Sequence, residues 1–207
     1  MSYDHLPEPY SIDPYSGKKL LLDFSQELTI ESFLNQLNIT DFYKICDCKL
    51  KDPKRYKKAR SIPFDYIPLD NLKDKYKNRG EVVYIMGIVD DILQAQAQAN
   101  VGKIGVTTDG MKKRHTSYNA GSRKTRKEGT PSTTNFHITE AIYATLREGK
   151  KVEWWVYDVP PREVETDWFG SGTMKTMKAS YGSPLESSLI AEYEKLTGHR
   201  PLLSTNG

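Results

Sequence analysis

The sequence predicts a fold of the α+β class (mixed α/β), in which helices pack against a small sheet. Three runs rich in β-branched and aromatic residues, 81–89, 101–108 and 151–159, have the length and composition of strands. The segments between and after them carry apolar residues at helical spacing. The resulting order is strand, strand, helix, helix, strand, helix, which suits one sheet packed by helices.

The first third of the chain, residues 1–79, is expected to be a separate module with helical and irregular structure. Residues 1–18 are rich in Pro, Tyr, Asp and Ser and indicate an extended arm. A helix is expected next, with Thr29 as its N-cap. Pro63 and Pro68 should break any regular element that follows. The apolar positions of the predicted helix are Ile30, Phe33, Leu34 and Leu37.

Three helices are predicted in residues 80–207. The first spans about 111–119, and the second, in FHITEAIYATLREGKK, places its apolar residues on one face and ends at Gly149. The last begins with Ser183 as N-cap and ends with Gly198 at C′.

The connections between these elements differ in character. The connector 90–100 is too long for a tight turn, so the first two strands are expected to pair through an inserted excursion. The segment DWFGSGTMKTMKASYGS, residues 167–183, is expected to be an irregular insertion containing glycines.

The composition is that of a folded but polar protein. The chain has 207 residues, 37% of them hydrophobic, and its 13 tyrosines argue against disorder. No apolar run approaches the roughly 18 residues of a membrane-spanning helix, and the start of the sequence lacks signal-peptide features, so the cytoplasm is the expected location. Cys46 and Cys48 lack further ligands for a zinc site and are interpreted as reduced structural thiols.

Charge is strongly segregated along the chain. The net charge is +3, but residues 44–60 carry +6 and residues 112–127 carry +7, which leaves −10 on the rest. Two concentrated basic segments favour a surface that binds a polyanion such as nucleic acid. The alternative is that both segments are solvated helix faces and loops.

Five short motifs, in this order, resemble those of the GIY-YIG nuclease superfamily. They are VVY at 82–84, KIG at 103–105, Arg114 with Tyr118 one helical turn later, ESSLIAEY from Glu186, and RPLLSTN ending at Asn206. The resemblance covers roughly residues 80–207 and is nearest to restriction-type and phage-type members, in which a lysine can replace the second motif tyrosine. It implies a small antiparallel three-stranded sheet flanked by helices.

The resemblance also implies five catalytic residues. Tyr84 matches a candidate general base, and Lys103 would lower its pKa, because a phenol with a pKa near 10 is a poor base at neutral pH. Arg114 would clamp the scissile phosphate. Tyr118 stands where many members carry a histidine and would stabilise the leaving group or the phosphate. Glu186 matches the metal-binding glutamate, a hard oxygen ligand suited to Mg²⁺, for which Mn²⁺ could substitute.

Simpler interpretations of the same residues stay open. Tyr84 alone is typical of an ordinary strand, and Arg114 of a helix surface. Ser183 and Glu186 also form the S-x-x-E pattern of a capping box, which needs only a helix start. Glu192, on the same predicted helix, is the alternative metal ligand.

These observations predict a divalent-metal-dependent, sequence-specific double-strand DNA endonuclease of type II restriction type. The alternatives are a phage or mobile-element nicking endonuclease of low specificity, a catalytically inactive DNA-binding module, and an RNA nuclease. A homodimer is expected because two strands must be cut, with residues 1–79 serving DNA recognition or dimerisation. No membrane and no organic cofactor is expected. The predicted DNA-binding residues are Lys112, Lys113, Arg123, Lys124, Arg126, Lys127 and Asn206.

Overall fold

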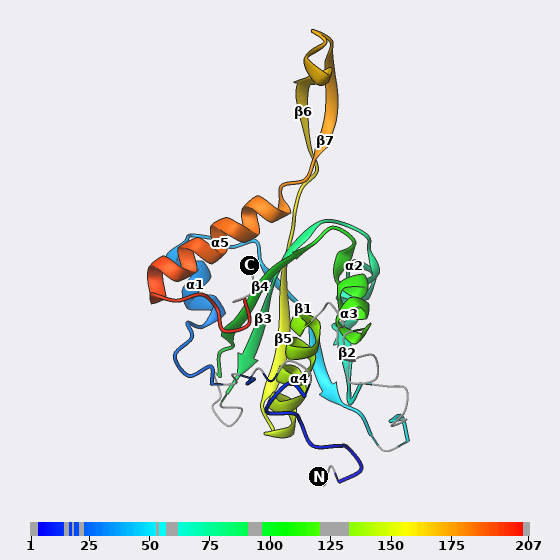
Figure 1. The fold of residues 1–207 in the computed structure, drawn as a ribbon, viewed down its shortest axis with the longest axis vertical. Helices are drawn as coiled ribbons and strands as arrows, with labels where there is room; N and C mark the ends of the chain where they lie inside the picture. The colour runs from blue at the N-terminus through cyan, green and yellow to red at the C-terminus, as the bar shows by residue number, and fades with distance from the viewer. Residues whose placement is uncertain are drawn as a thin grey trace.

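The main element of the structure is a five-stranded sheet in the order β2-β1-β5-β3-β4, in which all neighbours are antiparallel (Figure 1). The computed structural model describes residues 4–14, 17, 19–20, 23–52, 54–56, 62–90, 97–120 and 133–204. The α+β class is confirmed. The strands are β1 (Tyr43–Leu50), β2 (Phe64–Pro68), β3 (Val82–Val89), β4 (Asn100–Thr107) and β5 (Lys151–Asp158).

Strand β3 is buried along its whole length because it lies between β4 and β5 with helices on both faces. Its run VVYIMGIV suits such a position, since branched and aromatic side chains pack well on a pleated surface. β3 and β4 pair as expected across the connector 90–100, of which residues 91–96 lie outside the described residues.

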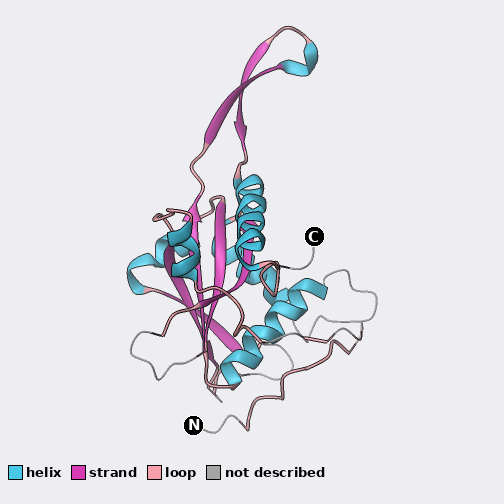
Figure 2. Ribbon diagram, turned by 90° about the vertical axis from the view of Figure 1, so that its left-hand side faces the viewer, coloured by secondary structure: helices cyan, strands magenta, loops and turns pink. Residues whose placement is uncertain are grey.

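Two layers of helices cover the sheet (Figure 2). On one face α3 and α4 pack over Tyr84, Met86 and Trp154, and on the other α1 and α5 pack over Val83 and Ile85. Within the described part of the chain, no helix combines the length and apolarity that crossing a membrane requires. The helices are α1 (Ile30–Gln36), the 3₁₀ turn Asp70–Leu72, α2 (Lys73–Lys77), α3 (Gly110–Ala120), α4 (Thr133–Arg147) and α5 (Gly182–Thr197).

The predicted end signals of two helices are confirmed. The Thr29 hydroxyl accepts a hydrogen bond from the backbone N–H of Ser32 at 3.1 Å, so it caps α1. Gly198 follows α5 with a φ of 80°, and its N–H donates to the Glu194 carbonyl at 2.8 Å. Glycine reaches this left-handed conformation without steric penalty.

The sheet is larger than the three strands expected. β1 escapes prediction because its buried residues, such as Cys46 and Cys48, alternate with charged ones, and Lys44 and Asp47 form an ion pair at 2.7 Å. β2 ends at Pro68 and is an edge strand, where the missing N–H of a proline is tolerated. The expectation that the prolines exclude a regular element there is wrong.

The sheet continues across the boundary expected after residue 79. β1 and β2 precede this position, and β1 pairs with β5, which follows it. A role of residues 1–79 in DNA recognition or dimerisation stays a prediction.

Cys46 and Cys48 are free and buried on β1. Burial raises the pKa of the Cys48 thiol to about 12 and raises that of Cys46 as well. A thiol in such an apolar site is unreactive, as expected of structural cysteines.

A second, two-stranded sheet projects from the body as a hairpin (Figures 1 and 2). It consists of β6 (Arg162–Asp167), the 3₁₀ turn Trp168–Gly170 and β7 (Met174–Ala179). Most of its side chains are exposed, including Phe169 at 89%. The prediction of an irregular insertion is therefore wrong for this segment, whose strands pair with each other and not with the main sheet.

The start of α5 differs from the predicted capping box. The N-cap is Tyr181, and Ser183 lies inside the helix. The carboxylate of Glu81 instead accepts the backbone N–H groups of Tyr181 at 3.3 Å and Gly182 at 2.9 Å. A carboxylate satisfies the free N–H groups of a helix start and opposes its positive dipole end. Glu186 is therefore not used as a cap.

Candidate active site

The five predicted catalytic residues come together around β4, the edge strand next to β3. Tyr84 comes from β3, Lys103 from β4, Arg114 and Tyr118 from α3, and Glu186 from α5. The charges of Lys103, Arg114 and Glu186 influence one another, and those of Arg114 and Glu186 also act on Tyr84. One locus on the protein therefore contains all five.

Tyr84 is fully buried, and its ring lies across the neighbouring strand at Gly105. A Cβ atom at Gly105 would come within 2.3 Å of the Tyr84 ring and hydroxyl. Glycine is therefore required here, because it alone leaves space for the ring. The glycine of the KIG motif thus directs the Tyr84 hydroxyl over β4.

The Tyr84 hydroxyl is held from α3. It lies 2.6 Å from the Tyr118 hydroxyl and accepts a hydrogen bond from Arg114 Nε at 3.0 Å. The Arg114 guanidinium also lies over the Tyr118 ring, 4.5 Å from its centroid. Because Arg114 and Tyr118 are one helical turn apart, they present both groups on the same face of α3.

Trp154 on β5 packs against the aromatic rings of Tyr84 and Tyr118. The ring of Trp154 lies 5.6 Å from that of Tyr84, 5.8 Å from that of Tyr118 and 4.5 Å from that of His115. His115 Nδ1 is 2.9 Å from the Tyr76 hydroxyl, and burial holds the pKa of His115 well below its ordinary value. His115 is thus a neutral packing residue that anchors α3 to the sheet.

Burial and the charge of Arg114 act in opposite directions on the pKa of Tyr84. Burial raises the pKa of Tyr84, and the guanidinium of Arg114 opposes this shift more strongly than any other group. Arg114, which also donates the hydrogen bond to the hydroxyl, is thus a cation that acts on Tyr84, and the tuning role expected of Lys103 stays a prediction. Since burial dominates, Tyr84 is protonated at neutral pH.

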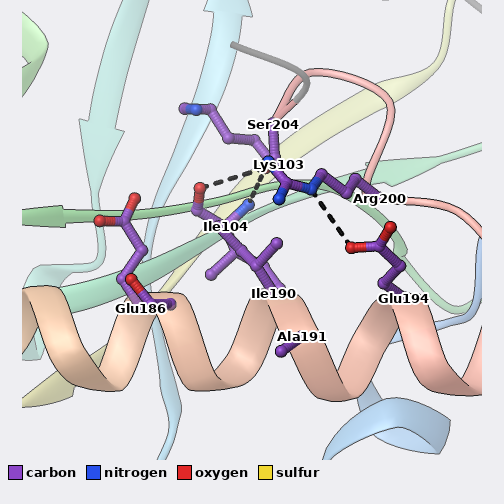
Figure 3. Close-up of a pocket in the computed structure, with 9 residues that line it drawn as sticks. Lys103, Ile104, Glu186, Ile190, Ala191, Glu194, Arg200 and Ser204 are labelled. Carbon is purple, nitrogen blue, oxygen red and sulfur yellow. Dashed lines mark hydrogen bonds and ion pairs between the residues drawn. The ribbon is translucent and has the colours of Figure 1, made fainter. Parts of the chain in front are cut away.

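Lys103 faces a cavity of about 290 Å³ between β4 and α5 (Figure 3). Its side chain is buried, and its ammonium donates to the Leu203 carbonyl at 3.3 Å. Within the described residues it forms no ion pair. Burial and the nearby Arg114 lower the pKa of Lys103 to about 8, whereas Glu186 opposes the shift. A buried ammonium without an ion-pair partner lowers the stability of the fold, and binding of an anion next to it would relieve this cost.

Glu186 lines the same cavity from the first turns of α5 (Figure 3). Burial raises the pKa of its carboxyl, and Lys103 and Arg114 act in the opposite direction. The alternative ligand Glu192 lies outside the cavity and pairs with Lys195 at 3.5 Å. Of the two carboxylates predicted as metal ligands, Glu186 is therefore the one that lines the cavity with Lys103.

The residues present fit a magnesium ion held by one carboxylate. Among the described residues no group of three or more His, Cys, Asp or Glu side chains could enclose a metal. Mg²⁺ does not require such a group, since it keeps several waters and is often bound through one or two carboxylates plus substrate phosphates. The half-buried Glu186, beside an open cavity, offers this kind of site.

The predicted DNA-binding residues are only partly within the described chain. Lys112 and Lys113 are exposed on α3, and Lys113 forms an ion pair with Asp109 at 2.7 Å. The others lie outside the described residues: Arg123, Lys124, Arg126, Lys127 and Asn206.

Several residues that shape the site were not predicted to do so. Trp154 was placed on a strand but not at the site, and Glu81 had no expected role. Arg200 and Ser204 line the cavity although they follow the last helix. The one local signal for Arg200 was that it belongs to the RPLLSTN motif. Its place at the cavity could not be predicted, because it depends on residues 201–204 packing back against β4.

No protein-family model matches the sequence, and no curated protein matches it. Among solved structures, the chain is similar to restriction endonuclease Hpy188I in complex with product DNA, with 21% identity over 89% of this chain and 90% of that chain and a TM-score of 0.49. It is also similar to a mutant of bacteriophage T4 EndoII, with 20% identity over 79% of this chain and 94% of that chain and a TM-score of 0.48.

Proposed function

We propose that this protein is a divalent-metal-dependent endonuclease that hydrolyses phosphodiester bonds in double-stranded DNA. One observation carries the proposal: Arg114 is hydrogen-bonded to a buried tyrosine pair, and the unpaired Lys103 and the carboxylate of Glu186 lie beside it. Phosphodiester hydrolysis needs cationic donors around the phosphate, a carboxylate for a divalent ion and a group that moves a proton. All three are present at one edge of the sheet.

The residues divide this work according to their surroundings. Arg114, oriented by its hydrogen bond to Tyr84, binds the scissile phosphate. Tyr84 and Tyr118 are protonated at neutral pH, because burial raises the pKa of each, and their paired hydroxyls hold Arg114 in position for the phosphate. Lys103 has a pKa of about 8 and can exchange a proton near neutral pH.

Glu186 would hold the metal. A divalent ion there supplies positive charge next to the phosphate, and Mn²⁺ is expected to replace Mg²⁺ because both prefer oxygen ligands. Sequence-specific cleavage of type II restriction type and a homodimer with two sites belong to the proposal as well, since one site cuts one strand. The exposed Lys112 and Lys113 on α3 would contact the DNA backbone.

The test is cleavage of phage-length duplex DNA by the purified protein, with Mg²⁺ or with EDTA, beside two variants. Glu186→Ala is expected to abolish cleavage and to keep DNA binding, because only the metal ligand is removed. Glu192→Ala, on the same helix but outside the cavity, is the control and is expected to cleave normally.

The pattern of products separates the alternatives. Discrete fragments that disappear both with EDTA and in Glu186→Ala support a metal-dependent, site-specific endonuclease. Nicks without double-strand breaks favour the nicking enzyme, and cleavage of RNA alone favours an RNA nuclease. DNA that shifts on a gel but is never cut, with any divalent ion, refutes the enzyme and leaves a DNA-binding module.

A further inference from the structure

The cavity beside β4 continues beyond the predicted catalytic residues. Lys103 and Glu186 lie at one end, and Arg200 and Glu194 lie at the other (Figure 3). Glu186 and Glu194 are separated by about 12 Å along α5, at 1.5 Å per residue. The side chain of Ile190 lies between them and is apolar, so no acidic group of α5 interrupts the cavity between its ends.

Arg200 has guanidinium N–H groups that are available to bind a ligand. Its Nε donates to Glu194 at 3.2 Å, and among the described residues no acceptor for its remaining N–H groups is found. The side chain is about half exposed, at 48%. An arginine oriented through Nε keeps its two terminal nitrogens available as a fork, which matches two oxygens of a phosphate.

The backbone that carries Arg200 is fixed to the edge of β4. The Ser204 hydroxyl accepts the N–H of Ile104 at 2.9 Å and donates to the carbonyl of Ile104 at 3.2 Å. The N–H of Leu203 donates to the Gly102 carbonyl at 2.9 Å. The turn after α5 is therefore held against β4, and Arg200, which precedes it, is oriented by Glu194 before a ligand binds.

We propose that Arg200 binds a backbone phosphate of the DNA strand that flanks the scissile phosphate, so that the strand follows the cavity along α5. The inference rests on the proposed function, since it takes the scissile phosphate to lie at the end with Lys103 and Glu186. The span of about 12 Å along α5 corresponds to between three and four nucleotide rises of about 3.4 Å along a duplex axis. The contact is a positioning one, because phosphate contacts fix register and do not read sequence.

The first experiment measures binding alone, in EDTA, with a short random-sequence duplex over a range of salt concentrations. Removing one phosphate contact is expected to lower the slope of log K against log salt by about 1. Arg200→Met should therefore bind about 10-fold more weakly at low salt and show the smaller slope. Lys195→Met is the matched control, because it loses the same charge near the same end of α5 but lies outside the cavity.

The second experiment locates the phosphate. Substrates with one neutral methylphosphonate linkage, moved step by step from the cleavage position, are cut by the full-length protein with Mg²⁺. The wild type should lose about 10-fold in rate at one flanking position about three or four nucleotides away. Arg200→Met should show no further loss at that position, because the contact is already missing.

The outcomes separate the two proposals. If Arg200→Met binds with the wild-type affinity and salt slope, the Arg200 site is refuted even when the protein is a nuclease. If the wild type never cleaves but Arg200→Met alone lowers the slope, the phosphate site stands and the endonuclease fails. If Lys195→Met changes the slope as much as Arg200→Met, the change in slope comes from the loss of one positive charge anywhere near this end of α5. The Arg200 site is then refuted.

Discussion

The candidate active site and the β6–β7 hairpin are close in sequence, since β7 ends only seven residues before Glu186. They differ in burial: the site is packed inside the protein body, and the hairpin is exposed to solvent. At the site, side chains from four elements contact or influence one another, and Tyr84 and Tyr118 are fully buried. The hairpin strands pair with each other and expose Phe169 and Met174 at the far end.

The difference shows which part of the chain can position reacting groups. A two-stranded hairpin is marginally stable alone in water, so it cannot hold a side chain to the accuracy that catalysis needs. The packed edge of β4 can hold side chains in place, because moving one side chain there disturbs the side chains in contact with it. Substitutions at the site are therefore expected to change activity and stability, and substitutions in the hairpin to leave the fold unchanged.

The largest effect is expected for Arg114→Lys. It keeps the charge but loses the planar fork and the hydrogen bond to Tyr84, and one donor to a developing charge is worth about 100-fold or more in rate. The measurement is the cleavage rate with Mg²⁺, and Thr116→Ala, exposed on the same helix, is the control. A rate within a few-fold of wild type would show that Arg114 does not bind the phosphate.

Lys103→Met is expected to stabilise the fold while it abolishes cleavage. The folded-state pKa of Lys103 is about 8, below the ordinary 10.5, so the unfolded state binds the proton more tightly. Below pH 8 the buried ammonium therefore destabilises the wild type, by about 3 kcal/mol for a shift of this size. That penalty is relieved as the pH rises from 8 towards 10.5.

Denaturant unfolding in EDTA across this pH range tests the Lys103 prediction. The stability gain of Lys103→Met over wild type should be largest below pH 8 and vanish near pH 10.5. A gain that is constant with pH would mean that better packing, and not the lost charge, causes it.

Gly105→Ala is expected to destabilise the fold by about 1 to 3 kcal/mol and to impair cleavage. The new methyl group meets the ring and hydroxyl of Tyr84 at 2.3 Å, so the tyrosine must leave its place beside Arg114. Gly80→Ala is the control, because nothing lies within 4 Å of a Cβ there. Equal thermal stabilities of both variants would contradict the close crossing of Tyr84 over β4.

The smallest effect is expected for Phe169→Asn at the hairpin tip. Phe169 is 89% exposed and has a φ of 52°, a conformation that asparagine tolerates better. Its replacement should change the free energy of unfolding by less than about 0.5 kcal/mol. Destabilisation by several kcal/mol would show that the tip packs against the body, which would remove the contrast between the two regions.

Local patterns were sufficient for part of the molecule. The continuous apolar run at Val82–Val89 predicts a buried strand, and Thr29 and Gly198 predict helix ends, because these signals depend on backbone preferences within a few residues. The resemblance of the motifs identified Tyr84, Arg114, Tyr118 and Glu186 as members of one site, and the structure brings them together around β4.

Contacts between distant segments could not be predicted in the same way. β1 alternates charged and apolar residues and becomes a central strand only when β5 and β2 pair with it. Glu81 caps a helix that begins a hundred residues later. Arg114, rather than Lys103, became the partner of Tyr84 because α3 packs over the ring, and packing is decided by the whole chain.

The sequence by itself thus determined the α+β class, the strands β3, β4 and β5, the main helices and the residue types of the site. Only the tertiary structure decided which groups share the cavity, including the place of Arg200 beside Glu194. The physical reason is the range of the forces involved: backbone preference and hydrophobic period act over a few neighbouring residues. Burial, pKa shifts and hydrogen bonds across the sheet exist only after the distant strands have paired.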